Sequence, residues 1–288
     1  MLRRFRLEEP DTIQAASDLL VRFGDAARLY AGGTELLLVM KEGLVRYERL
    51  INIKQIPNLN QVKLDNGAIS IGALATHREL TVSPVLRESL PALVQMENNV
   101  ANIRVREVGT IGGNLCFAEP HADPGTLLLV LGAKLIAAKK TGQREIAVEN
   151  FFRDAYETSL ESDELLTEIR IPRPSAAGGL AYLKFGYLER PSVGVAVRVE
   201  FNGGEKKWIA EARIAVGCAG PAPRRVEEAE APLKGKSIQE ATHLIDEAGG
   251  IAGRASQAIS DLHGSQEYKE HIVQVLVKRA FQQAVQKS

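Results

Sequence analysis

The sequence contains very little cysteine: Cys116 and Cys218 are the two cysteines among 288 residues. They lie far apart and form no Cys-x-x-Cys pair. This pattern excludes a disulfide framework, a zinc site of the usual spacing and an iron–sulfur cluster bound by this chain alone. We therefore expect both cysteines to be small core residues in a reducing compartment.

The chain also has no excess of charge of either sign, since 36 Lys and Arg residues balance 36 Asp and Glu residues. No overall field draws it to nucleic acid or to an anionic membrane. Its one tryptophan and six tyrosines form no stacking ladder for single-stranded nucleic acid. No apolar run approaches the roughly 18 residues of a membrane span, and the opening MLRRFRLEEP lacks the apolar core of a secretory signal. We expect a cytoplasmic protein.

Several well-known motifs are absent. There is no G-x-G-x-x-G, H-E-x-x-H or G-x-S-x-G. Gly235–Ser237 resembles the end of a phosphate-binding loop, but Glu230 stands where the first glycine belongs. The stretch Glu119–Asp123 contains metal-binding side chain types, yet a single histidine beside carboxylates is more typical of a solvated turn. The sequence therefore predicts no metal site, and it indicates no catalytic acid, base or nucleophile.

The periodicity of the chain predicts an α+β protein of three parts, covering residues 1–56, 57–176 and 177–288. In the first part Asp11 is expected to cap a helix over IQAASDLLVRF, and strand-like RLYA precedes helix-like TELLLVMKEG, with Thr34 as its N-cap. The second part mixes hairpins with short helices. The third begins with three alternating segments, typical of an antiparallel sheet, and continues with helices near 222–231, 237–248 and 266–286.

Two stretches each contain a pair of adjacent glycines: AGGTE at 31–35 and TIGGN at 110–114. One interpretation is that both are plain tight turns. The other is that both are loops whose backbone N–H groups bind a phosphate, because glycine permits positive φ and close approach. Two such loops that converge on one diphosphate would need no lysine or arginine.

Four segments, taken in order, resemble a known family. They are AGGTELLLVMK, ISIGALATHREL, VGTIGGNLCFAEPHADP and DELLTEIRIP. Together they resemble the FAD-binding medium subunit of the molybdenum hydroxylases, a group that includes carbon monoxide dehydrogenase and xanthine dehydrogenase. The resemblance covers nearly the whole chain.

This resemblance implies the FAD-binding fold of p-cresol methylhydroxylase and vanillyl-alcohol oxidase, a β/α subdomain plus a mixed subdomain, followed by a three-stranded antiparallel sheet with helices. It also implies FAD-binding roles. The first loop would wrap the diphosphate, Thr76 would lie near the flavin, the second loop would form a second clasp, Asp123 would bind ribityl or adenosine hydroxyls, Leu166 would pack on adenine, and Lys184 would approach the flavin. The residues concerned are Ala31, Gly32, Gly33, Thr34, Glu35, Leu36, Thr76, Thr110, Ile111, Gly112, Gly113, Asn114, Asp123, Leu166 and Lys184.

One position departs from the family pattern. Some relatives place an aromatic residue beside the flavin in the strand that follows the second part, where this chain has Val193 in RPSVGVAV. The chain also lacks the cysteine-rich insertion of the relatives that reduce aromatic thioesters. His77 and His121 are the nearest candidates for a covalent flavin link, and we expect neither to form one.

The function implied by the resemblance is electron transfer. A large partner with a molybdenum cofactor would oxidise the substrate, a small partner with iron–sulfur clusters would deliver electrons to FAD in this chain, and an external acceptor would remove them. The assembly implied is a dimer of heterotrimers. Two alternatives stay open: a self-sufficient FAD-dependent oxidase or reductase of the same fold, and a cofactor-free scaffold in which both glycine pairs are plain turns.

Overall fold

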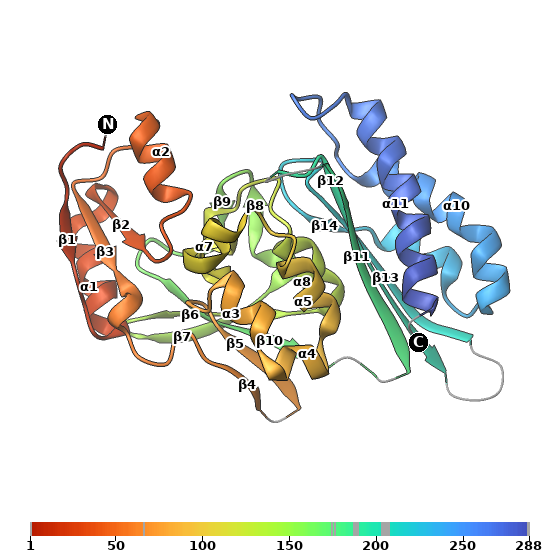
Figure 1. The fold of residues 1–288 in the computed structure, drawn as a ribbon, viewed down its shortest axis with the longest axis horizontal. Coiled ribbons are helices and arrows are strands. Elements are labelled where there is room, and N and C mark those ends of the chain that lie inside the picture. Colours follow the sequence, from red (N-terminus) through yellow and green to blue (C-terminus); the bar gives the residue numbers. More distant parts are fainter. Residues whose placement is uncertain are drawn as a thin grey trace.

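The structure is a computed structural model that describes residues 2–65, 67–173, 175, 177–186, 190–202 and 208–286. Three main sheets follow one another along the long axis of the molecule, each with its own helices (Figure 1). No helix of the described residues has the length and apolar character needed to cross a membrane.

The N-terminal sheet is parallel, with strand order β1-β3-β2. Thr12, not the expected Asp11, caps α1: its hydroxyl oxygen accepts a hydrogen bond from the Ala15 N–H at 3.2 Å. Glu35, not Thr34, holds the N-cap position of α2. The elements are β1 (Arg6–Glu8), α1 (Ile13–Phe23), β2 (Ala27–Tyr30), α2 (Leu36–Glu42) and β3 (Arg49–Asn52).

The central sheet is antiparallel, with order β4-β5-β10-β6-β7. Ile71 faces Ile169 and Ile69 faces Ile171 across β5 and β10, and all four side chains are fully buried beneath the helices. The elements are β4 (Val62–Asp65), β5 (Ala68–Gly72), α3 (His77–Val82), α4 (Pro84–Ser89), α5 (Pro91–Glu97), α6 (Ile103–Val108), α7 (Ile111–Phe117), α8 (Pro124–Leu131), β6 (Lys134–Lys139), β7 (Gly142–Ala147), β8 (Phe152–Asp154), β9 (Glu157–Thr158) and β10 (Leu165–Pro172).

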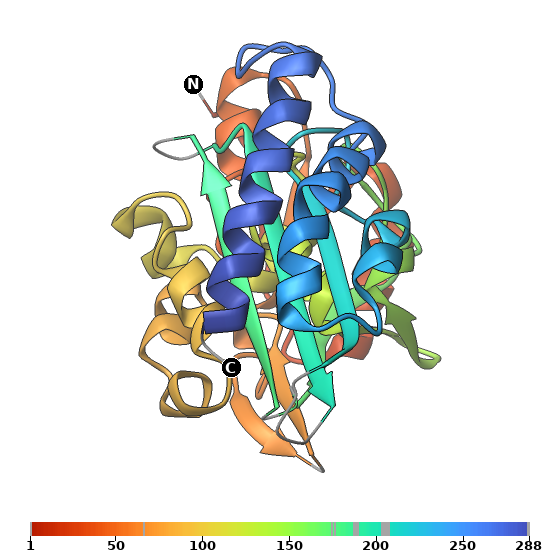
Figure 2. The same ribbon diagram turned by 90° about the vertical axis from the view of Figure 1, so that its right-hand side faces the viewer.

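The C-terminal sheet contains the three expected antiparallel strands and a short fourth one, in order β11-β12-β13-β14. Only Glu227–Glu230 (α9) of the predicted helix at 222–231 is α-helical, because Arg224–Arg225 form β14 and a 3-10 helix begins at Ala231. Helices α10 and α11 cover one face of this sheet (Figure 2). The elements are β11 (Gly178–Phe185), β12 (Val193–Asn202), β13 (Trp208–Gly217), β14 (Arg224–Arg225), α9 (Glu227–Glu230), α10 (Ile238–Ala255) and α11 (Gln266–Gln286).

The three sheets are packed against one another through shared apolar residues. Leu74 and Leu165 of the central part join the core of the N-terminal part. Helix α8 fills the space between the central sheet and the uncovered face of the C-terminal sheet, and all eight of its residues are buried. The segment that follows β2 and the segments around α3 and α7 are thereby held in fixed relative positions.

Candidate cofactor site

The first glycine pair lies between β2 and α2, and its conformation requires glycine at two positions. Gly33 has a φ of +74°, in the region that side chains disfavour. At Gly32, an added Cβ would lie 2.3 Å from the Val108 carbonyl oxygen and 2.7 Å from the Gly109 Cα. The first glycine segment, residues 31–35, therefore packs directly on the backbone that leads into the second glycine segment, residues 110–114.

The second glycine pair is not a loop, which corrects the expectation from sequence. Ile111, Gly112, Gly113 and Asn114 form the first turn of α7, and the Thr110 hydroxyl caps this helix by accepting from the Gly113 N–H at 3.1 Å. The N–H groups of Ile111 and Gly112 donate to the carbonyl oxygens of Ala75 and Ala73. These N–H groups are thus already used within the protein.

Gly112 and Gly113 differ in their surroundings. Gly112 is buried, and an added Cβ would lie 2.5 Å from both the Cβ and the carbonyl oxygen of Ala73. Gly113 is exposed, and an added Cβ would approach only the Thr110 hydroxyl oxygen, at 2.8 Å. Gly112 therefore serves internal packing, whereas Gly113 presents bare backbone outward.

Thr76 lies beside this turn. It forms an isolated antiparallel bridge with Thr110, so the predicted flavin-side residue and the second glycine segment are adjacent. Its hydroxyl accepts from the Glu79 N–H at 3.1 Å, and its N–H donates to the Glu79 carboxylate at 2.7 Å, which together form a capping box at the start of α3.

Two observations fit a polar ligand at these segments. The side-chain oxygen Oδ1 of Asn114 is buried and accepts no hydrogen bond from the described residues. Within the described part of the chain, the N–H groups of Gly32, Gly33 and Thr34 donate to no other backbone group. Buried polar atoms in folded proteins almost always have partners. The N–H groups of the first segment suit phosphate oxygens, which accept, and Asn114 Oδ1 suits a hydroxyl or amide donor; FAD carries groups of both kinds.

Asp123 and Lys184, two further predicted site residues, form a buried ion pair. Lys184 Nζ lies 3.0 Å from Asp123 Oδ2 and also donates to the Asn99 carbonyl oxygen at 2.7 Å. Tyr182 donates its hydroxyl to Asp123 Oδ1 at 2.6 Å. Burial raises the pKa of the Asp123 carboxyl, while Lys184 and Tyr182 act in the opposite direction. Both carboxylate oxygens thus have protein partners.

Leu166 and Val193 occupy core positions. Leu166 pairs with Ala137 across β10 and β6 and is 4% exposed, so it belongs to the central apolar core. Val193 is fully buried in the C-terminal core. Its side chain therefore does not form the exposed cover that an aromatic residue would provide.

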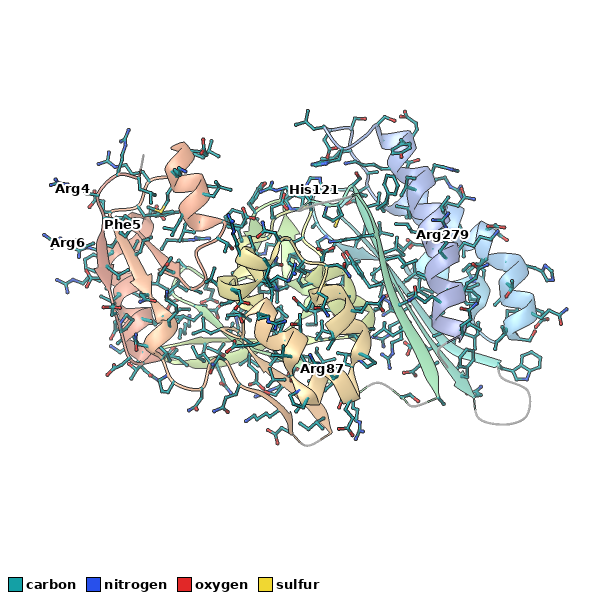
Figure 3. The ribbon with its side chains drawn as sticks, in the orientation of Figure 1. Arg4, Phe5, Arg6, Arg87, His121 and Arg279 are labelled. Atoms are coloured by element: carbon teal, nitrogen blue, oxygen red, sulfur yellow. The ribbon has the colours of Figure 1, made fainter. Side chains whose placement is uncertain are left out.

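A charged network that local sequence patterns did not predict lies where the central and C-terminal parts meet, around His121 (Figure 3). His121 Nδ1 lies 3.1 Å from a Glu119 oxygen, and His121 Nε2 lies 3.3 Å from Asp261. Lys269, which is fully buried, donates to Asp261 at 2.6 Å. The metal-capable stretch at Glu119 is thus engaged in ion pairs, and the described residues contain no cluster arranged to hold a metal ion.

Arg190 extends this network to the first glycine segment. Its guanidinium lies 3.3 Å from Glu119 and 3.3 Å from Glu35. It therefore ties the loop after β2 to both the central and the C-terminal part. No sequence pattern marks Arg190, because it is distant in the chain from both of its partners.

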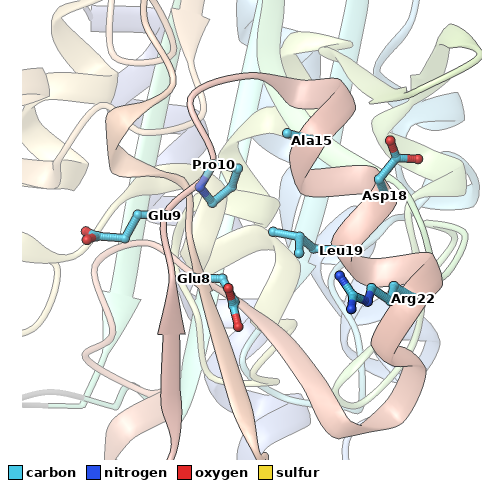
Figure 4. A pocket seen from close by; sticks show the side chains of 7 residues that line it. All are labelled: Glu8, Glu9, Pro10, Ala15, Asp18, Leu19 and Arg22. Atoms are coloured by element: carbon cyan, nitrogen blue, oxygen red, sulfur yellow. The ribbon is translucent and has the colours of Figure 1, made fainter.

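The remaining features lie outside this site. A surface hollow on the N-terminal part is lined by seven residues of β1, α1 and the chain between them (Figure 4): Glu8, Glu9, Pro10, Ala15, Asp18, Leu19 and Arg22. None of them is a predicted site residue.

Both cysteines are free, and burial raises the pKa of the Cys116 thiol to about 12, so this thiol is not a nucleophile near neutral pH.

Comparisons with known proteins cover almost all of the chain. Residues 3–174 match the FAD binding domain in molybdopterin dehydrogenase, and residues 190–284 match the CO dehydrogenase flavoprotein C-terminal domain. The carbon monoxide dehydrogenase medium chain of Hydrogenophaga pseudoflava is 31% identical over 98% of this chain and 97% of its own length. The nicotine 6-hydroxylase medium subunit of Paenarthrobacter nicotinovorans is 31% identical over 98% of each chain.

Similarity in three dimensions is equally extensive. A solved structure of carbon monoxide dehydrogenase from Hydrogenophaga pseudoflava, which lacks the Mo-pyranopterin moiety of the molybdenum cofactor, aligns with a TM-score of 0.95. The alignment covers 100% of this chain and 99% of that chain at 31% identity.

Proposed function

The chain belongs to the family of FAD-binding medium subunits of the molybdenum hydroxylases, and from this premise we propose that it is the FAD-carrying electron-transfer subunit of such a complex. It is an oxidoreductase component that binds FAD and works with a molybdenum-cofactor large subunit and an iron–sulfur small subunit. The match to an FAD-binding family over residues 3–174 argues against a cofactor-free scaffold.

The observation that carries the proposal is the close packing of the first glycine segment on the backbone just before the second, with polar groups in both segments that have no hydrogen-bond partner among the described residues. Gly32 approaches the backbone at Val108 and Gly109, and in the first turn of α7 the Asn114 Oδ1 atom is buried without a partner among the described residues. This supports FAD binding by residues 31–36 and 110–114, with Thr76 beside them. Roles for Asp123, Leu166 and Lys184 belong to the same proposal and rest on the family resemblance.

The chain's own residues bind and position the cofactor. FAD held there would supply the redox chemistry that links one-electron donors to a two-electron acceptor. The N–H groups of Gly32, Gly33 and Thr34 would donate to its phosphate oxygens. Arg190, through Glu35 and Glu119, would hold the first glycine segment against the rest of the site.

Three further parts of the proposal concern organisation. We place the domain boundaries near residues 56 and 176. We place the protein in the cytoplasm, a choice supported by its two free cysteines, Cys116 and Cys218. We also propose a dimer of heterotrimers, in line with the family.

Anaerobic stopped-flow absorbance tests whether the flavin of this chain is reduced by substrate directly or only through the partner subunits. The isolated FAD-loaded chain should show no fast flavin bleaching with carbon monoxide, aldehydes, purines or N-heterocycles, because in our proposal the substrate is oxidised at the molybdenum cofactor of the large partner subunit. The same flavin should bleach rapidly once the two partner subunits and the correct substrate are present. Fast reduction of the isolated chain by any of these substrates would instead establish the self-sufficient oxidase or reductase.

We predict that FAD is held without a covalent bond. His77 Nδ1 is engaged with Glu97 at 2.6 Å, both ring nitrogens of His121 face carboxylates, and the Cys116 thiol is protonated. Acid precipitation should release the yellow chromophore into the supernatant as intact FAD, identified by chromatography. Yellow colour that stays with the pellet would contradict this prediction.

A further inference from the structure

A buried histidine–glutamate pair lies directly behind the two glycine segments. His77 begins α3 immediately after Thr76, and its N–H donates to the Gly109 carbonyl oxygen at 3.0 Å. Its ring nitrogen Nδ1 lies 2.6 Å from Glu97 Oε2 at the end of α5. The His77 side chain is 3% exposed and that of Glu97 is 0% exposed.

The Glu97 side chain is fully buried, and an ionised carboxylate at this place would need a cationic partner. An ionised carboxylate removed from water is costly unless a cation and hydrogen bonds offset the loss of hydration. A second buried carboxylate, Asp123, is near enough to interact electrostatically with Glu97, and it already has Lys184 as its cation. His77 Nδ1 lies within hydrogen-bonding distance of Glu97 Oε2, and the other oxygen of Glu97, Oε1, accepts no hydrogen bond from the described residues.

The opposite edge of the His77 ring faces the junction of the glycine segments. Its carbon Cδ2, which is bonded to Nε2, lies 3.3 Å from the place where a Gly109 Cβ would be. The Thr34 hydroxyl oxygen lies 3.4 Å from the same place, and the Gly109 Cα is the atom that Gly32 approaches. His77 therefore contacts the junction from the side opposite Glu97.

The two glycine segments contain no lysine or arginine, and the guanidinium that reaches the first segment, that of Arg190, is paired with Glu35 and Glu119. We propose that His77 is a doubly protonated imidazolium, fixed by Glu97, that supplies positive charge to the diphosphate of FAD at the junction of Gly32, Thr34 and Gly109. This inference rests on the proposed FAD-binding function and deepens it. Glu97 acts as a positioning residue that keeps the proton on His77 and orients its ring.

The experiment distinguishes two roles of His77: supplying positive charge to FAD, and serving only as the counter-charge of Glu97. His77→Gln removes the cation and leaves Glu97 buried without a counter-charge, so the apo protein should melt at a lower temperature and bind FAD about 10-fold more weakly. The double variant His77→Gln/Glu97→Gln removes both charges, and a neutral amide pair should restore most of the melting temperature. Its FAD affinity should stay about 10-fold weaker than that of the wild type.

Dissociation constants come from the quenching of flavin fluorescence, and melting temperatures from circular dichroism of the apo proteins. His271→Gln, on the exposed face of α11, is the matched control and should change neither quantity. Recovery of both stability and FAD affinity in the double variant would overturn the inference, because the pair would then be purely structural. Absence of FAD binding by the wild-type chain would instead refute the proposed function itself.

Discussion

Replacement of Gly32 by valine should abolish stable FAD binding. The new Cβ would lie 2.3 Å from the Val108 carbonyl oxygen and 2.7 Å from the Gly109 Cα, so the first glycine segment would move away from the second. Because our proposal has FAD contact both segments at once, we expect its dissociation constant to rise by about 100-fold or more. Flavin fluorescence titration of the purified apo protein measures this directly.

The matched control is the same substitution at a helical glycine with open surroundings. An added Cβ at Gly250 in α10 would meet only the end of the Arg254 guanidinium, at 3.4 Å. Gly250→Val should therefore bind FAD like the wild type. Wild-type FAD affinity in a folded Gly32→Val protein would show that contact between the two segments is not needed for the cofactor.

Removal of Lys184 should give the largest loss of stability. Lys184→Met leaves the carboxylate of Asp123, which is 3% exposed, without its counter-charge. Loss of one partner of a buried ion pair lowers the free energy of unfolding by about 3–5 kcal/mol. Because Lys184 is partly accessible to water, we expect a decrease of about 3 kcal/mol at pH 8. Urea denaturation of the apo protein measures the free energy of unfolding.

This loss should depend on pH with a definite sign. Burial raises the pKa of Asp123 in the folded state above its unfolded value, and removal of Lys184 raises it further. At a pH between the unfolded-state pKa and the folded-state pKa of Asp123, the folded protein binds more protons than the unfolded protein. The free energy of unfolding therefore falls as the pH rises through this range. The deficit of Lys184→Met should accordingly be greatest at pH 8 and shrink toward pH 5.

The double variant Lys184→Met/Asp123→Asn separates structure from cofactor binding. With both charges removed, most of the stability should return at pH 8. If Asp123 also binds FAD hydroxyls, as the family resemblance implies, this stable variant will still bind FAD more weakly than the wild type. A deficit of Lys184→Met that is equal at pH 5 and pH 8 would contradict the raised pKa of Asp123.

The sequence predicted the parts of the fold that depend on local patterns. Three alternating segments predicted the antiparallel strands of the C-terminal part, and the order of four short motifs identified the family and hence the arrangement of its subdomains. Helix starts were less certain, since Asp11 and Thr12 are adjacent and both are good capping residues. The structure selects Thr12.

The sequence misassigned the second glycine pair because glycine is a poor helix former. Tertiary contacts outweigh that propensity: Thr110 caps the turn, and the carbonyl oxygens of Ala73 and Ala75 accept its first N–H groups. Gly112 is explained by its contact with Ala73, which no local pattern contains. The Arg190 bridge and the His77–Glu97 pair were missed for the same reason, since each joins residues from different elements.

Helix α8 affects whether the two regions of this protein can be expressed as separate fragments. The two family matches end and begin at residues 174 and 190, which invites separate expression of the two pieces. Yet α8 belongs to the first piece by sequence, and its buried residues pack against β12 and β13 of the second. A fragment ending at residue 174 would expose an apolar helix to water and invite aggregation. A hybrid protein that receives the C-terminal region of a relative should therefore receive that relative's α8 as well, because this helix packs against both parts.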